Sequence, residues 1–272
     1  MRASRSSRTI IAIVGLALLT GCGQPRRAAQ RTSEVGEAYL APPTLTSATH
    51  APGGAVQLMG SAPAGAEVRL RSPDGSDATV KAGGDGAWAV TLPPADTPRL
   101  YAFEARVGAR VLKGEGALAV LPPPEIAALV LRGGYAALPP GSGAPGRLEL
   151  IAFDYDGGGA AVVGVAAPGS PVRFLIDGGV VGAAQANSEG RFAMVAVDPR
   201  RGVAPGVHTI RVEAKGGQTV ERRVEVKAPQ MAPDRAYVAE RDAHGWALSW
   251  RTPGGGLQTS LAFDPTQGGV AR

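Results

Sequence analysis

The strongest constraint on the fold of this chain is an internal repeat. The segment Gly60–Leu70 aligns with Gly164–Phe174 at an offset of 104 residues. Asp85–Val90 aligns with Glu189–Met194 at the same offset. One duplicated unit of about 75 to 85 residues explains these matches. We therefore expect two similar domains in tandem.

Within each copy, apolar and polar residues alternate. Val68 and Leu70 flank Arg69, and the second copy repeats the pattern at Val172 and Phe174. Alternation with a period of two places one face of a strand in a core and the other in water. Asp-Gly and Gly-Gly pairs between the runs suit hairpin turns. The chain also has 39 Gly and 23 Pro, which argues against long helices. The predicted fold class is all-β, with two tandem immunoglobulin-like β-sandwiches.

The second copy resembles the Ig-like modules of proteobacterial envelope proteins that often end in a LysM module. The matching segments are Leu150–Asp156, Pro168–Val172, Leu175–Asp177 and Pro205–Glu213. The two-helix pattern of LysM does not occur after residue 228. The resemblance implies a sandwich fold and a place in the cell envelope, and it does not imply an enzyme.

Composition shifts along the chain predict six segments. The region between the copies is rich in Pro and Gly, and the tail has two alternating runs around a Gly-rich turn, which is typical of a hairpin. The expected segments are a signal peptide at 1–21, a disordered tether at 22–43, a first Ig-like domain at 44–122, a linker at 123–146 that could contain one strand, a second Ig-like domain at 147–228, and a C-terminal hairpin at 229–272 packed on the second domain.

The N-terminus has the pattern of an export signal. Arg2, Arg5 and Arg8 precede an uncharged apolar run at Ile10–Thr20. A helix of that length reaches about 16 Å, which is too short for a hydrocarbon core of roughly 30 Å. The run is therefore expected to be a signal-peptide segment and not a transmembrane anchor.

The end of this run resembles the bacterial lipoprotein signal. Leu19, Thr20 and Gly21 are followed by Cys22, the one cysteine of the chain. The resemblance implies cleavage before Cys22 and acylation of its thiol and amine. Two or three acyl chains would hold the protein stably on a membrane. Gly23 follows in place of Asp, which by the same resemblance favours the outer membrane, facing the periplasm. The alternative is an ordinary signal peptide followed by an incidental cysteine.

The sequence lacks the motifs of the common catalytic and metal sites. His50, His208 and His244 are scattered without ligand spacing, and there is no second cysteine, so we expect no metal. No Gly-x-Ser-x-Gly or Ser-x-x-Lys motif occurs, and no lysine follows a glycine as a P-loop requires. We expect no catalytic residues, no cofactor and no enzymatic activity. The formal charge of +5 includes the three arginines of the signal, and no basic stripe points to nucleic acid.

Four aspartates near turns could be read as a calcium cluster at a domain junction: Asp154, Asp156, Asp177 and Asp198. Calcium takes six to eight oxygen ligands. Aspartate beside a turn more often hydrogen-bonds the turn itself, so we favour that role.

Two tryptophans of the tail are candidates for contact with sugar. Trp246 and Trp250 share one face of a predicted strand and could stack on glycan or peptidoglycan rings. The alternative, which we favour, is that they cover the open side of the second sandwich.

These features predict a non-catalytic, lipid-anchored envelope protein that acts as a scaffold or a protein-binding module. The alternative is a peptidoglycan- or glycan-binding accessory protein that uses the aromatics of the tail. In both cases the lipid contacts the membrane, and the partner is an envelope protein or a glycan.

Overall fold

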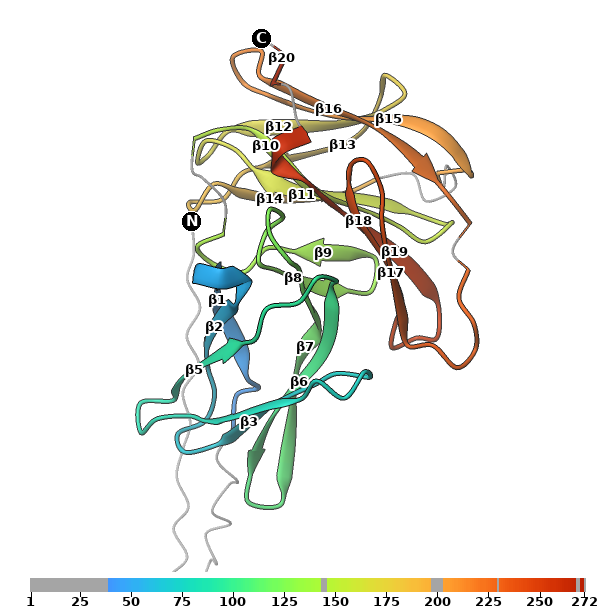
Figure 1. Ribbon diagram of the computed structural model, residues 1–272. Coiled ribbons are helices and arrows are strands. Elements are labelled where there is room, and N and C mark those ends of the chain that lie inside the picture. Colours follow the sequence, from blue (N-terminus) through green and yellow to red (C-terminus); the bar gives the residue numbers. More distant parts are fainter. Residues whose placement is uncertain (1–38, 143–145, 197–202, 229, 268–269, 272) are drawn as a thin grey trace, which may run out of the picture. The chain divides into compact units, whose positions relative to one another are not determined.

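The first copy of the repeat folds into two antiparallel sheets (Figure 1). A computed structural model describes residues 39–142, 146–196, 203–228, 230–267 and 270–271. One sheet has the order β1-β2-β5, formed by Thr44–His50, Val56–Ser61 and Ala87–Leu92. The other contains the order β4-β3-β6-β7, formed by Ala78–Lys81, Glu67–Arg71, Arg99–Val107 and Arg110–Val120.

The second copy repeats this arrangement. Its first sheet contains the order β14-β11-β10, formed by Arg191–Val195, Ala160–Val165 and Glu149–Tyr155. Its second sheet contains the order β13-β12-β15-β16, formed by Gly179–Gln185, Pro171–Ile176, Gly206–Ala214 and Thr219–Val226. The described residues contain no α-helix, only short 3-10 turns at Pro52–Gly54 and Pro265–Gln267. The all-β sandwich prediction is confirmed.

A glycine occupies the same position in both copies, and its packing explains one of the sequence matches between them. Gly60 on β2 faces Trp88, and Gly164 on β11 faces Phe192. A Cβ atom at either glycine would lie 2.0 or 2.1 Å from a backbone carbonyl oxygen, and 2.3 or 2.6 Å from the aromatic ring. Both glycines also lie opposite a β-bulge in the neighbouring strand. The repeat therefore preserves a place where a ring packs directly on backbone.

Each sandwich has its own apolar core. The core of the first includes Leu58, Leu70 and Tyr101, and the core of the second includes Phe153 and Phe174. All five side chains are almost completely buried. The alternating apolar positions identified in the sequence thus supply the inner faces of both sandwiches.

The region between the copies contains two strands where the sequence suggested one. These are β8 (Ala128–Arg132) and β9 (Tyr135–Ala137). Gly133 and Gly134 form the turn between them, and Gly134 has a φ of 97°, which favours glycine. Because β8 pairs with β7, this hairpin continues the larger sheet of the first copy.

The tail also contains more strands than the predicted hairpin. The hairpin itself is formed by β18 (Gly245–Arg251) and β19 (Leu257–Phe263). A further strand, β17 (Tyr237–Arg241), pairs with β18, and a short β20 (Val270–Ala271) pairs with β16. The tail joins the second copy edge to edge, because β19 pairs with β10.

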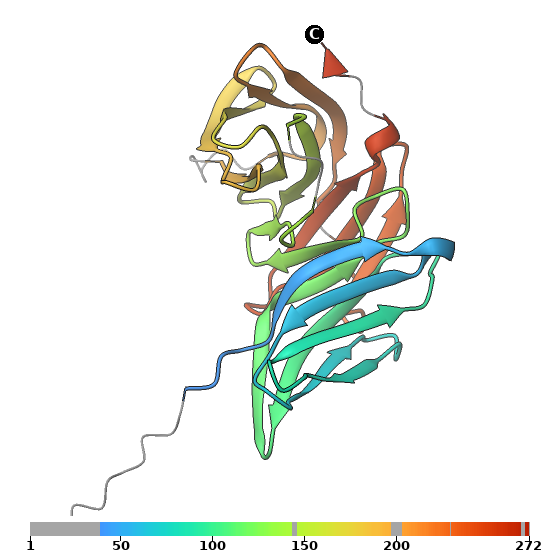
Figure 2. The ribbon, with the colours of Figure 1, turned by 90° about the vertical axis from the view of Figure 1, so that its left-hand side faces the viewer.

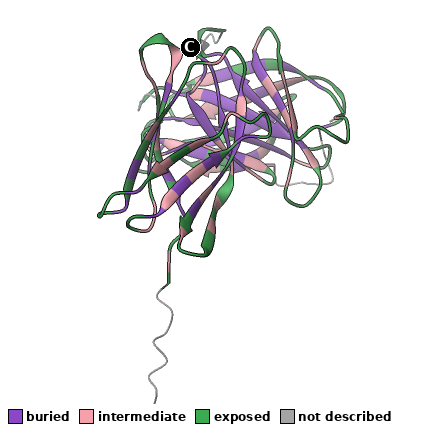
Figure 3. Ribbon diagram, turned by 60° about the horizontal axis from the view of Figure 1, so that its bottom comes forward, coloured by how far each residue is buried: buried purple, intermediate pink, exposed green. Residues whose placement is uncertain are grey.

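The two copies share a third apolar cluster. Their ribbons adjoin in Figure 2, and Figure 3 colours the buried residues of both purple. Leu129 and Leu131 of β8 contribute to the cluster from the first copy, and Val163 and Ala152 contribute from the second. Both faces of β10 and β11 are therefore buried, and all six residues of Ala160–Val165 are buried. Leu40–Arg272 form one compact unit as a result.

Candidate functional site

The predicted lipidation site lies outside the described residues. Leu19, Thr20, Gly21 and Cys22 all fall within 1–38, so cleavage and acylation at Cys22 remain predictions. Within the residues that the structure does describe, no helix has the length and apolar character needed to cross a membrane.

The two tail tryptophans are buried in the third cluster. Their exposed fractions are 7% for Trp246 and 2% for Trp250. The guanidinium carbon of Arg241 lies 5.4 Å from the centre of a Trp246 ring and covers it further. Sugar stacking requires an open ring face. The burial favours the packing role over glycan contact for both residues.

The side chains of His208 and His50 have structural partners. His208 Nδ1 donates to Asp177 Oδ2 at 2.7 Å, and its Nε2 donates to the Ala204 carbonyl at 2.8 Å. Burial acts to lower the pKa of His208, but these hydrogen bonds outweigh it and raise that pKa. Two donating nitrogens require the imidazolium form. His50 Nε2 lies 2.9 Å from the Glu125 carbonyl oxygen. Across the described part of the chain, no three His, Cys, Asp or Glu residues form a metal-binding group.

Each described aspartate that was considered for calcium accepts its own set of hydrogen bonds. Asp156 Oδ1 accepts bonds from the backbone N–H groups of Gly158 and Gly159 at 2.9 and 2.7 Å, which closes the β10–β11 turn. Asp177 binds His208 and also caps the Thr209 N–H at 2.8 Å. Asp198 lies outside the described residues.

Asp154 is the centre of a buried polar network that ties the β8–β9 hairpin to the second copy. Its Oδ2 accepts the Ala136 N–H at 2.8 Å, and its Oδ1 accepts from Ser260 Oγ and from Gln258 Nε2. Gln258 Oε1 in turn accepts the Gly134 N–H at 2.8 Å. Burial raises the pKa of Asp154 to about 6, although the three hydrogen bonds act to lower it.

Arg241 fixes the end of β17 against the segment that follows β7. Its two terminal nitrogens lie 3.1 Å from Glu125 Oε1 and 3.5 Å from Asp264 Oδ2. The Glu125 side chain is fully buried, and this burial raises its pKa. The ion pairs therefore position the end of β17 relative to the segment between the copies and to the end of β19.

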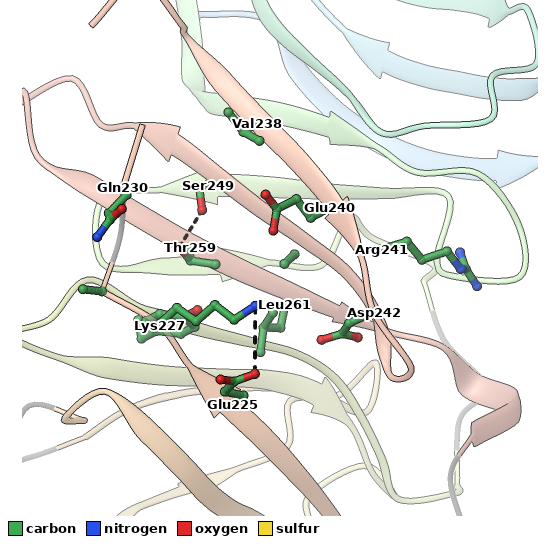
Figure 4. A pocket seen from close by; sticks show the side chains of 13 residues that line it. Glu225, Lys227, Gln230, Val238, Glu240, Arg241, Asp242, Ser249, Thr259 and Leu261 are labelled. Carbon is green, nitrogen blue, oxygen red and sulfur yellow. Dashed lines mark hydrogen bonds and ion pairs between the residues drawn. The ribbon is translucent and has the colours of Figure 1, made fainter. Parts of the chain in front are cut away.

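A hollow of about 600 Å³, which we call the inner hollow, lies over one face of β17–β19 (Figure 4). Its floor includes Ser249 and Thr259, whose hydroxyls are 2.8 Å apart. Its rim includes Glu225 and Lys227, an exposed pair 3.9 Å apart, and Glu240. Polar groups and carboxylates thus line this sheet face together with Val238, Ala247 and Leu261.

A second hollow of about 1050 Å³, which we call the edge groove, runs beside β17. It is bounded by β17, by the segment 230–236, and by the first copy at Pro73, Asp74, Thr97 and Pro98. Tyr237 Oη donates to Asp74 Oδ2 at 3.3 Å across this boundary. Gln230, Val238 and Glu240 line both hollows, so the two adjoin at β17.

The edge groove has an excess of negative charge. Asp74, Asp234 and Glu240 line it, against one cation, Arg235. Burial acts to raise the pKa of Asp74, but hydrogen bonds from Ser76, Ser72 and Tyr237 lower it to about 2. Asp74 is therefore ionised at neutral pH.

Comparisons with known proteins leave the family open. No family model matches the chain, and no curated protein matches it. One solved structure, titled as the BSP domain of a biofilm-associated protein, is 14% identical with a TM-score of 0.22. The match covers 62% of this chain, which spans only 27% of that one.

A second solved structure comes from work on host cell surface retention of a 1.5-MDa bacterial ice-binding adhesin. It is 10% identical with a TM-score of 0.18, over 77% of this chain and 80% of that one. Neither score establishes a shared fold.

Proposed function

We propose that this protein is a non-catalytic, lipid-anchored component of the bacterial cell envelope that binds a partner protein beside β17. The observation that carries the binding role is the pair of adjoining hollows beside that strand. Exposed strand edges and the grooves beside them are common sites of protein recognition.

The fixed position of β17 supports a binding role. Arg241 joins this strand to Glu125 and Asp264, and the Asp154 network joins the neighbouring strands to the β8–β9 hairpin. A site built on packed strands is held in one geometry before the partner arrives, which lowers the entropy lost on binding.

The local chemistry of the described residues supports a role without catalysis. His208 is the histidine that is paired with a carboxylate, as in a catalytic pair, but its other ring nitrogen is bonded to a backbone carbonyl. That bond leaves the ring no free nitrogen with which to activate a nucleophile.

Anchoring is tested by the Cys22→Ser substitution. We expect the full chain to incorporate radiolabelled palmitate and to sediment with the outer membrane, and Cys22→Ser to lose both properties. The physical reason is that the lipid would supply nearly all the membrane affinity. Palmitate labelling that persists in Cys22→Ser would contradict the anchor.

The choice between a protein and a glycan partner is tested with purified sacculi. We expect the full chain not to co-sediment with peptidoglycan that has been stripped of protein. Saturable binding to stripped sacculi would instead support the glycan-binding alternative.

A further inference from the structure

The outer edge of β17 presents backbone groups that β18 does not use. The N–H of Asp242 bonds the Gly245 carbonyl at 2.9 Å, and the N–H of Arg251 bonds the Ala236 carbonyl at 3.2 Å. In an antiparallel pair, residues whose N–H and C=O groups bond the neighbouring strand alternate with residues whose N–H and C=O groups point away from it. The N–H and C=O groups of Tyr237, Ala239 and Arg241 therefore point away from β18.

This edge differs from the edges formed by β4 and β13. At the sides of the two sandwiches, β4 lies against β5 and β13 lies against β14, so those edges approach one another. The outer edge of β17 borders the edge groove instead. An unpaired edge beside an open groove can accept an added strand from another chain.

The charge of the groove indicates which strand fits. The three carboxylates of Asp74, Asp234 and Glu240 outnumber the single cation of Arg235. We propose that the edge groove receives an extended, lysine- or arginine-rich segment of the partner protein, which adds as a strand to β17. This inference rests on the proposed function and identifies the chemistry of its partner.

A second copy of this chain fits the groove less well. Antiparallel pairing of two β17 strands would bring two acidic grooves together, including Glu240 and Asp234 from each molecule. Juxtaposition of like charges across an interface is destabilising. A cationic strand would place opposite charges there and would also bind faster at low salt.

The test uses the full chain in detergent micelles and two fluorescein-labelled peptides of about nine residues, enough for one strand. One peptide alternates valine or threonine with lysine, and the other replaces each lysine with glutamate. We expect the lysine peptide alone to bind in fluorescence anisotropy, and its affinity to fall as salt rises.

Two variants separate strand addition from simple charge attraction. Ala239→Pro removes an outward N–H while leaving every bond to β18 in place, and proline is tolerated at such edge positions. We expect it to weaken binding of the lysine peptide by about tenfold or more. Ala239→Ser keeps the N–H and should bind as the wild type does. Asp234→Asn combined with Glu240→Gln should weaken binding by about threefold to tenfold and flatten its salt dependence.

Thermal unfolding of each variant establishes that it is folded before binding is compared. Equal binding by wild type and folded Ala239→Pro would overturn strand addition. Preferential binding of the glutamate peptide would overturn the cationic partner, and so would absence of binding by either peptide. Dimerisation of the free protein that Ala239→Pro abolishes would assign the edge to a second copy. None of these results affects palmitate labelling, so the proposed anchor is tested separately.

Discussion

Trp250→Ala is expected to lower the free energy of unfolding by about 3 to 5 kcal/mol. The side chain of Trp250 is 2% exposed and packs in the third apolar cluster, between the two copies. Replacing a buried tryptophan with alanine removes apolar contact and leaves a cavity that the surrounding strands fill only in part. Chemical denaturation of the full chain measures the change.

Val180→Ala is the matched control for this experiment. Val180 lies on β13 and is 56% exposed, so its truncation should change the free energy of unfolding by less than about 0.5 kcal/mol. Trp250→Phe should cost less than Trp250→Ala because it keeps a ring in the cluster. If Trp250→Ala were as mild as Val180→Ala, the tryptophan would be a surface residue, as the sugar-stacking hypothesis requires.

Asp154 is expected to make the protein more stable as the pH falls from neutral. Burial raises its pKa from 3.8 to about 6 in the folded protein. Between these values the folded state binds a proton that the unfolded state releases, so acidification favours folding. From about pH 7.5 to about pH 4.5, this single group should add about 2 kcal/mol to the free energy of unfolding.

The Asp154→Asn variant isolates this contribution. Asp74, Asp177 and Asp264 have lowered pKa values and lose their stabilising effect in acid, which opposes Asp154. The informative quantity is therefore the difference in unfolding free energy between wild type and Asp154→Asn, measured by denaturation at several pH values. We expect the free energy of unfolding of the wild type to rise relative to that of the variant as the pH falls. A difference that stays constant across this range would show that the pKa of Asp154 is not raised in the folded protein.

The sandwiches could be predicted from the sequence because their cores depend on local patterns. Alternation at positions such as Val68 and Leu70 defines a strand with one buried face, and the repeated Gly60 and Gly164 mark the same contact between ring and backbone in both copies. The joining of the copies was not predicted. One signal for it was present: Ala160–Val165 is apolar without alternation, as is typical of a strand buried on both faces.

The candidate site could not be predicted because its parts come from distant segments. The edge groove combines Asp74, Thr97 and Glu240, which lie far apart in the sequence and form no local motif. Strand β17 is five residues long, and its apolar and polar residues alternate only in part. Its sequence therefore predicts no more than a segment that leads into the hairpin. Only the pairing of β19 with β10 places this strand at an open edge beside the first copy.

Binding of an envelope protein at β17 is tested most directly in living cells. A photo-cross-linking amino acid would replace Val238, which lines both hollows, and, in a separate strain, the exposed Val180 of β13. We predict one discrete protein adduct from position 238 that is absent from position 180 and is lost when Ala239→Pro is added. No adduct at position 238, or the same adducts from both positions, would contradict partner binding at this strand.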